Sequence, residues 1–395
     1  MTTVEEALQI IKSQRRFYGT ENISFLKATQ RVLAEAIYAD LDFPSFNRVC
    51  MDGIAISYDA FEKGCRVFRI EGIQAAGSPQ MTKSQKENCL EVMTGAVLPN
   101  GADVIVPYEK VEISNGFAKV LVDEVSKLQH VHLKGKDRSK GSVLIKKNTV
   151  ITAAEVGILA TVGKTEVLVK KQPKVLIVST GDELVDVNQT PLAHQIRRSN
   201  VYSLQSMING LGIEAETQHL EDDKEMLEIE IAKQFELYDV LIFSGAVSKG
   251  KYDYLPEVLE GLGVKKSFHR VKQRPGKPFW FGVKDEKIVF AFPGNPVSTY
   301  VNCLQYFYPW YQISMGLNNE PIYATLSEDV TFKPALTYFL QVRLKSDNAT
   351  LVAEPVSGNG SGDLANMVAA DAFVILPPEQ THFEKGAVFP VLRYR

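Results

Sequence analysis

The centre of this chain is best predicted from residues 239–254, which have the sequence DVLIFSGAVSKGKYDY. Within them, Val240–Phe243 is a short apolar run that predicts a buried strand. Small and polar residues follow at 244–250, and apolar residues then recur at helical spacing through Leu262. A strand, a Gly/Ser loop and a helix in this order direct backbone N–H groups and a helix N-terminus towards an anion. An ordinary tight connection between strand and helix has the same pattern, so this loop alone leaves both interpretations open.

A second stretch repeats the design. Residues 287–298, KIVFAFPGNPVS, combine an apolar strand, a Pro-Gly-Asn-Pro turn and the start of a helix that we expect to run to about Ile313. Further units of strand and helix begin at Val175–Val178 and continue through Ser199–Asn209. Repeated units of this length predict a doubly wound, mainly parallel α/β sheet. Its two loops would converge at the carboxyl edge, where open α/β sheets bind ligands.

Outside this sheet the patterns change along the chain. Thr3 with Glu6, and Thr152 with Glu155, have the spacing of capping boxes and predict two helices. Another short helix is expected around 31–36. Short apolar runs with Gly, Pro and Asn breaks predict strands on both sides of the α/β region. We therefore predict a multidomain α/β protein: a discontinuous helical and extended N-terminal domain at 1–41 with 140–171, an inserted β-rich domain at 42–139, the α/β domain at 172–318, and a C-terminal β-barrel-like domain at 319–395.

Composition excludes several classes of protein. The net charge is −3 and no long basic run occurs, so we expect no nucleic-acid partner. No stretch approaches the ~18 apolar residues of a membrane-spanning helix, and we expect no membrane. The acidic and polar first ten residues differ from a signal peptide. Four scattered cysteines without a CxxC pair favour a reduced, cytoplasmic setting over a zinc site or a disulfide framework.

Three features are expected to meet at the loop edge of the α/β sheet. Backbone donors come from the two loops, and acids come from Glu183, Asp222 and Asp253. Cations come from Arg270, Lys272, Arg274 and Lys277. Cations with N–H donors bind phosphate or another oxyanion, and nearby acids hold Mg²⁺ or position water. The simpler alternatives are a solvated basic face and a helix cap at Asp222. No dinucleotide fingerprint, Walker A motif or nucleophile elbow is present.

Several motifs together resemble the molybdopterin molybdenumtransferase family, which includes MoeA and the E domains of gephyrin. They span nearly the whole chain and occur in the family's order. The motifs are Asp42-Phe43-Pro44 with Met51-Asp52-Gly53-Ile54-Ala55; Met93-Thr94-Gly95-Ala96; Gly135-Lys136-Asp137; Ser179-Thr180-Gly181-Asp182-Glu183-Leu184; Ser244-Gly245-Ala246-Val247-Ser248 with Gly250 and Asp253-Tyr254; Pro275-Gly276-Lys277-Pro278; Pro293-Gly294-Asn295-Pro296-Val297-Ser298; and Gly360-Ser361-Gly362-Asp363-Leu364.

The resemblance implies an elongated, four-domain homodimer whose active-site cleft contains residues of both subunits. It also implies a reaction in which molybdate enters the dithiolene of adenylylated molybdopterin. The phosphoanhydride is cleaved with help from a divalent cation such as Mg²⁺, AMP is released and molybdenum cofactor forms. Transient contacts with other proteins of molybdenum cofactor biosynthesis are expected.

The resemblance also assigns expected roles to single residues. Catalytic roles fall on Asp52, Thr94, Asp137, Glu183 and Asp222, with Asp52 and Asp137 reaching the cleft from the inserted domain. Asp253 would hold the metal. The pterin and its pyrophosphate would contact Thr180, Gly181, Ser244, Gly245, Ser248, Gly250, Pro293, Asn295 and Pro296. Arg270, Arg274 and Lys277 would offset phosphate charge, and Arg343 and Ser361 are the candidates for molybdate.

The chain departs from the family pattern at four places. Ala246 stands where glycine is usual, and a left-handed backbone there would cost roughly 1 kcal/mol or more. Arg274 replaces a lysine, Val49-Cys50 replaces Ser-Ala, and Asn366 replaces a common serine. Two alternatives to the insertion reaction stay open: the adenylyl transfer that makes adenylylated molybdopterin, and a diverged, non-catalytic scaffold that only binds molybdopterin.

Overall fold

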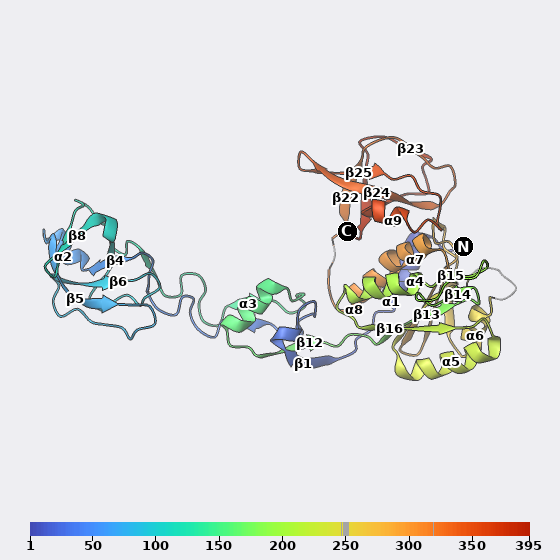
Figure 1. The fold of residues 1–395 in the computed structure, drawn as a ribbon, viewed down its shortest axis with the longest axis horizontal. Helices are drawn as coiled ribbons and strands as arrows, with labels where there is room; N and C mark the ends of the chain where they lie inside the picture. The colour runs from blue at the N-terminus through green and yellow to red at the C-terminus, as the bar shows by residue number, and fades with distance from the viewer. Residues whose placement is uncertain (246, 248–252, 319) are drawn as a thin grey trace.

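The chain forms an elongated molecule with a β-rich unit at one end and the α/β unit at the other (Figure 1). A narrow extended unit joins the two, and a C-terminal β unit lies beside the α/β unit. This computed structural model describes residues 1–245, 247, 253–318 and 320–395.

The α/β unit is built on one six-stranded sheet with the order β16-β13-β17-β21-β20-β18. In chain order the strands are β13 (Val175–Thr180), β16 (Ala215–Leu220), β17 (Val240–Ser244), β18 (Lys265–His269), β20 (Trp280–Lys284) and β21 (Lys287–Phe292). The first four strands in the sheet order are parallel, and β20 is antiparallel to both neighbours. Every residue of β17 is buried, as expected for a central parallel strand covered on both faces. The predicted mainly parallel, doubly wound sheet is confirmed.

Helices cover both faces of this sheet. One face carries α1 (Val4–Ser13), α4 (Asn200–Asn209) and the helical segment α7 (Pro296–Asn302), η3 (Cys303–Phe307) and α8 (Tyr308–Ser314). The other face carries α5 (Lys224–Leu237) and α6 (Leu255–Gly261). The predicted helix from Val297 to Ile313 is therefore present, with one π-helical turn at η3.

The extended unit pairs segments that are distant in sequence. Strand β1 (Thr20–Ser24) pairs with β12 (Glu166–Lys170), and β2 (Ile37–Tyr38) pairs with β11 (Val143–Ile145); η1 (Phe25–Lys27) and α3 (Ala153–Thr161) complete the unit. Both predicted capping boxes are present. The helix predicted at 31–36 is wrong, because Val32 and Leu33 form β-bridges with Val150 and Val169. Burial of these side chains against the pairing segments overrides local helix propensity.

The β-rich unit contains a six-stranded sheet of order β7-β4-β6-β5-β9-β8. Its elements are β3 (Arg48–Val49), β4 (Gly53–Ile56), α2 (Tyr58–Glu62), β5 (Val67–Gln74), β6 (Asn88–Val92), β7 (Val104–Pro107), η2 (Tyr108–Lys110), β8 (Val111–Ser114), β9 (Phe117–Val120) and β10 (Val131–His132). Two clusters of buried side chains fill it.

The C-terminal unit is a closed five-stranded barrel, because β24 pairs with both β25 and β26. Its elements are β22 (Ile322–Leu326), β23 (Val330–Thr331), β24 (Thr337–Asp347), β25 (Thr350–Pro355), α9 (Asn366–Ala369), β26 (Ala372–Leu376), β27 (His382–Phe383) and β28 (Val388–Arg393). Strand β19 (Gln273–Arg274) pairs with β24 and ties the α/β unit to the barrel. The domain boundaries given above stay a prediction. In the described part of the chain, no helix has the length and apolar character needed to cross a membrane.

Candidate functional site

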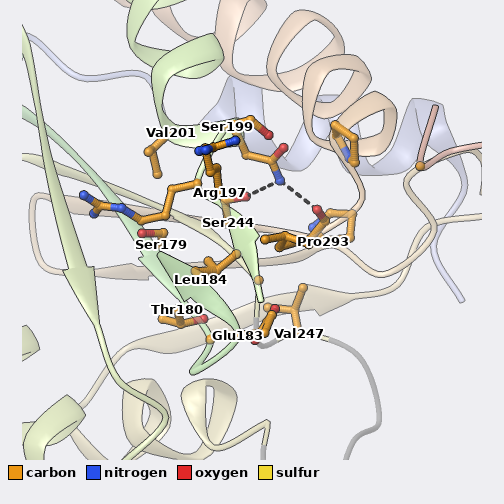
Figure 2. Close-up of a pocket in the computed structure, with 18 of the residues that line it drawn as sticks. Ser179, Thr180, Glu183, Leu184, Arg197, Ser199, Val201, Ser244, Val247 and Pro293 are labelled. Atoms are coloured by element: carbon orange, nitrogen blue, oxygen red, sulfur yellow. Dashed lines mark hydrogen bonds between the residues drawn. The ribbon is translucent and has the colours of Figure 1, made fainter. Parts of the chain in front are cut away.

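A pocket of about 540 Å³ lies where β13, β17 and β21 end at the carboxyl edge of the sheet (Figure 2). The loops after these three strands supply much of its wall, and the start of α4 closes one side. It is lined by Ser179, Thr180, Gly181, Glu183, Leu184, Ile196, Arg197, Arg198, Ser199, Asn200, Val201, Asp222, Ser244, Gly245, Val247, Asp253, Pro293, Gly294, Pro296, Gly362 and Leu364. The predicted convergence of the two loops is therefore confirmed.

The backbone conformation of the pocket loops requires glycine at two positions. Gly245 has a φ of +117°, and a Cβ there would lie 2.9 Å from the carbonyl oxygen of Thr180 and 3.0 Å from its Oγ1. Gly181 has a φ of +134°, and a Cβ there would lie 2.6 Å from Oε2 of Glu183. Since side chains rarely adopt such φ values, only glycine fits both positions without strain.

Asn200, which sequence reasoning missed, ties the two loops together. Its Nδ2 donates to Ser244 Oγ at 2.9 Å and to the Gly294 carbonyl oxygen at 2.7 Å, as the dashed lines in Figure 2 show. One amide at the start of α4 thus fixes both loops relative to each other. The signal was a Ser-Asn pair at the start of a predicted helix at this same sheet edge.

The three predicted acids Glu183, Asp222 and Asp253 all line the pocket. Burial, followed by the charges of Asp182, Glu183 and Asp253, raises the pKa of Asp222 to about 6. Within the described residues, Asp222 Oδ1 is buried without a hydrogen-bond partner. The helix-cap alternative is excluded, since the neighbouring Asp223 caps α5 by accepting from Met226 N at 2.8 Å.

A divalent cation would find oxygen ligands here. Asp222 Oδ1 and Thr180 Oγ1 are buried oxygens with no hydrogen-bond partner in the described part of the chain. Carboxylate and hydroxyl oxygens are the ligand type that Mg²⁺ prefers. The donor set fits such an ion, although no group of three or more metal-binding side chains is preassembled among the described residues.

The cations at the pocket differ from the expected ones. Arg197 and Arg198 line it, whereas Arg270 and Lys277 do not. Arg274 lines a separate cavity of about 230 Å³ together with Ser361. The basic run at 270–277 turns towards the barrel because β19 pairs with β24. Sequence reasoning missed Arg197 and Arg198 because they lie far along the chain from both glycine loops.

The smaller cavity lies between the α/β unit and the barrel, and hydrogen bonds connect the two units beside it. Asn295 Nδ2 donates to Ser361 Oγ at 2.9 Å, and the N–H of Val297 donates to the Ser361 carbonyl oxygen at 3.1 Å. Asn366, one of the departures from the family pattern, donates through Nδ2 to Oε1 of Gln341, which lines this cavity. The guanidinium of Arg343 instead donates to the Ala369 carbonyl oxygen at 3.3 Å.

The remaining predicted residues lie elsewhere. Oδ1 of Asp52 accepts hydrogen bonds from the Thr94 N–H at 2.6 Å and from the Thr94 hydroxyl at 2.7 Å. Both bonds lower the pKa of Asp52, and the bond from the N–H has the larger effect. Asp137 contacts His132 Nε2 at 2.8 Å. These residues belong to the inserted β-rich unit and its connection, so one chain does not bring Asp52 and Thr94 to the pocket (Figure 1). Ser248, Gly250 and the departure Ala246 lie outside the described residues.

Comparison with known proteins identifies the family. Residues 2–163 match the "MoeA N-terminal region (domain I and II)", 176–311 the "Probable molybdopterin binding domain", and 323–394 the "MoeA C-terminal region (domain IV)". The molybdopterin molybdenumtransferase of Synechocystis sp. is 40% identical over 99% of both chains. That of Staphylococcus aureus strain MRSA252 is 31% identical over 98% of this chain and 94% of the relative.

Solved structures agree with this match. Two structures of the MoeA protein from Pyrococcus horikoshii superpose with TM-scores of 0.84 over 100% of this chain and 99% or 100% of theirs. One is aligned at 30% identity, and the other, at 24%, supports the fold alone. The chain therefore belongs to the molybdopterin molybdenumtransferase (MoeA) family.

Proposed function

We propose that the protein inserts molybdate into adenylylated molybdopterin, releasing AMP and forming molybdenum cofactor. Membership of the family makes it a transferase of molybdenum cofactor biosynthesis. The pocket is the observation that best supports this reaction for the present chain. It combines three carboxylates and two arginines at the carboxyl edge of the sheet with a buried hydroxyl that has no hydrogen-bond partner among the described residues.

The pocket supplies groups that suit a pterin pyrophosphate. Thr180 Oγ1 is available to donate a hydrogen bond to a phosphate oxygen, and the start of α4 presents the positive end of its helix dipole. Arg197 and Arg198 offset phosphate charge. Gly245 and Gly294 let the ligand approach the backbone closely. The hydrogen bond from Asn200 fixes the position of the Ser244 hydroxyl at the pocket.

Asp253, with Glu183 and Asp222, would hold the divalent cation. Such a cation would supply positive charge that offsets the charge developing as the phosphoanhydride breaks. Burial and the neighbouring acids raise the pKa of Asp222 to about 6, so a bound cation would favour the charged form of this carboxyl.

The small cavity at the barrel suits the oxyanion substrate. Ser361 offers a hydroxyl and Arg274 a guanidinium, and Gly362 of the same loop lines the main pocket. Molybdate bound there would lie next to the ligand in the main pocket. Arg343 is on the same barrel, on β24, and would reach molybdate by leaving the Ala369 carbonyl.

A homodimer completes the proposal. Asp52 directly precedes β4, which lies in the β-rich unit at the other end of the molecule from the α/β unit (Figure 1). A second copy would bring Asp52, and with it Asp137, to the cleft. The four free thiols fit the cytoplasm as the site of the reaction. Transient contacts with other cofactor biosynthesis proteins would pass the unstable pterin along.

The proposal is tested by incubating purified protein with adenylylated molybdopterin, with and without molybdate and Mg²⁺, and quantifying AMP by chromatography. The account expects AMP release that requires molybdate and is accelerated by Mg²⁺. ATP consumption with unmodified molybdopterin would instead establish adenylyl transfer. Tight pterin binding without any AMP release would establish the scaffold and overturn the proposal.

A further inference from the structure

Arg198 lines both the pocket and a neighbouring cavity. That second cavity, of about 460 Å³, contains three carboxylates and is lined by Asp182, Leu184, Val185, Asp186, Gln189, Arg198, His219 and Glu221. Arg198 Nη2 forms an ion pair with Asp186 Oδ1. Asp186 lines only the second cavity, whereas Arg198 lines both, so the arginine that pairs with Asp186 also borders the pocket.

The two partners of this ion pair are buried to very different extents. The Arg198 side chain is 13% exposed, and that of Asp186 is 52% exposed. An ion pair with one partner largely in water contributes little stability. A guanidinium, by contrast, can bind a phosphate through two parallel N–H bonds, which are stronger than bonds between neutral groups. An exchange of Asp186 for a phosphate is therefore favourable for Arg198.

Two further features on the pocket side point to a bound ligand. Thr180 is only 3% exposed, and its Oγ1 has no hydrogen-bond partner in the part of the chain that the structure describes. A buried hydroxyl without a partner is costly unless a ligand supplies one. The first residues of the ten-residue helix α4 line the same wall and favour negative charge.

We propose that Arg198 determines phosphate affinity in this pocket by leaving Asp186 and binding the ligand, so that Asp186 competes with the ligand for the guanidinium. The inference rests on the proposed function only for the identity of the natural ligand. The exchange itself requires no more than an oligophosphate in the pocket.

The loop that carries Asp186 does not depend on the ion pair. Strands β14 (Leu184–Val185) and β15 (Ile196–Arg197) are joined by backbone bonds, with Arg198 N donating to the Val185 carbonyl oxygen at 2.9 Å. Arg197 Nε adds a bond to the Gln189 carbonyl oxygen at 2.9 Å. Asp186→Asn is therefore expected to leave the loop in place.

Titration calorimetry with inorganic pyrophosphate tests the exchange on the full chain. Arg198→Gln should weaken binding about tenfold or more, because a charge-assisted pair of hydrogen bonds is lost. Asp186→Asn should tighten binding about threefold, since the competitor is removed and an exposed ion pair is worth little. A residue that only braces the loop would behave differently, because loss of either partner would then weaken binding.

Arg16 and Glu286 offer a matched control pair in the same unit. Arg16 Nε lies 3.1 Å from Glu286 Oε2, and the two side chains are 15% and 84% exposed. Arg16 also contacts the turn between β20 and β21, and neither residue lines the pocket. Arg16→Gln and Glu286→Gln alter the net charge as the test variants do, and both should bind pyrophosphate like the wild type.

Unchanged affinity in Arg198→Gln would overturn the inference, as would an Asp186→Asn affinity equal to or below that of the wild type. Failure of this inference can be told apart from failure of the proposed function. Wild-type AMP release with no effect of Arg198→Gln on pyrophosphate binding overturns the inference alone. The expected pyrophosphate shifts without any AMP release overturn the proposed reaction alone.

Discussion

Replacing Gly245 by alanine should both destabilise the α/β unit and close the pocket. The φ of +117° is a conformation that side chains rarely adopt, and strain of this kind costs roughly 1–3 kcal/mol. The new Cβ would also lie 2.9 Å from the Thr180 carbonyl oxygen, a backbone atom that cannot rotate away. Adding about 1 kcal/mol for displaced packing, we expect a loss of about 2–4 kcal/mol in the free energy of unfolding.

Gly294 in the facing loop provides the control. Among the residues that the structure describes, a Cβ there meets only Gly245 Cα at 3.9 Å, an ordinary contact without strain. Gly294→Ala should therefore change stability by no more than about 0.5 kcal/mol. The comparison isolates backbone strain from the effect of adding a methyl group to a pocket loop.

Tryptophan fluorescence in a urea titration measures this change for the α/β unit alone. The chain has two tryptophans, and both Trp280 on β20 and Trp310 in α8 are fully buried in that unit. Gly245→Ala should lower the urea midpoint of the fluorescence transition, and Gly294→Ala should not. Equal midpoints for the two variants would refute the reasoning that the fold requires glycine at 245.

Three further outcomes are expected. The folded-state pKa of Asp222 lies above its unfolded value, so the free energy of unfolding of the α/β unit should fall by at most about 2 kcal/mol as pH rises from 4 to 7. Urea titrations at each pH should show a weaker pH dependence for Asp222→Asn. Asn200→Ala should lower unfolding free energy by about 1–3 kcal/mol and raise KM, because two hydrogen bonds are lost; unchanged KM would contradict its positioning role. Mixed dimers of Asp52→Ala and Asp222→Asn subunits should recover AMP release relative to either parent, and no recovery would contradict a shared site.

The α/β sheet was predictable because buried parallel strands are continuous apolar runs, as in Val240–Phe243. The glycine loops and the acids Glu183 and Asp222 were predictable for a related reason, since the carboxyl ends of parallel strands share one edge. The antiparallel orientation of β20 was not predictable, because an apolar run indicates a buried strand but not the direction in which it runs.

Residues whose roles depend on tertiary contacts escaped prediction. Arg197 and Arg198 reach the pocket only because β15 pairs back onto β14, and nothing local in the sequence marks that pairing. The basic run at 270–277 resembled a phosphate site but pairs with the barrel through β19. Asp52 was predicted to reach the cleft, yet in a single chain it lies at the end of the elongated molecule opposite the pocket.

The central claim is that the pocket at the ends of β13, β17 and β21 is where molybdenum insertion takes place. Molybdate-dependent AMP release from adenylylated molybdopterin, measured side by side for the wild type, Asp222→Asn and Asp223→Asn, tests it most directly. Asp223 is the adjacent acid that caps α5, and asparagine caps equally well, so Asp223→Asn should keep wild-type activity. Asp222→Asn should lose about 100-fold or more in kcat while remaining folded, because a ligand of the divalent cation is removed. Full activity in Asp222→Asn would contradict the account.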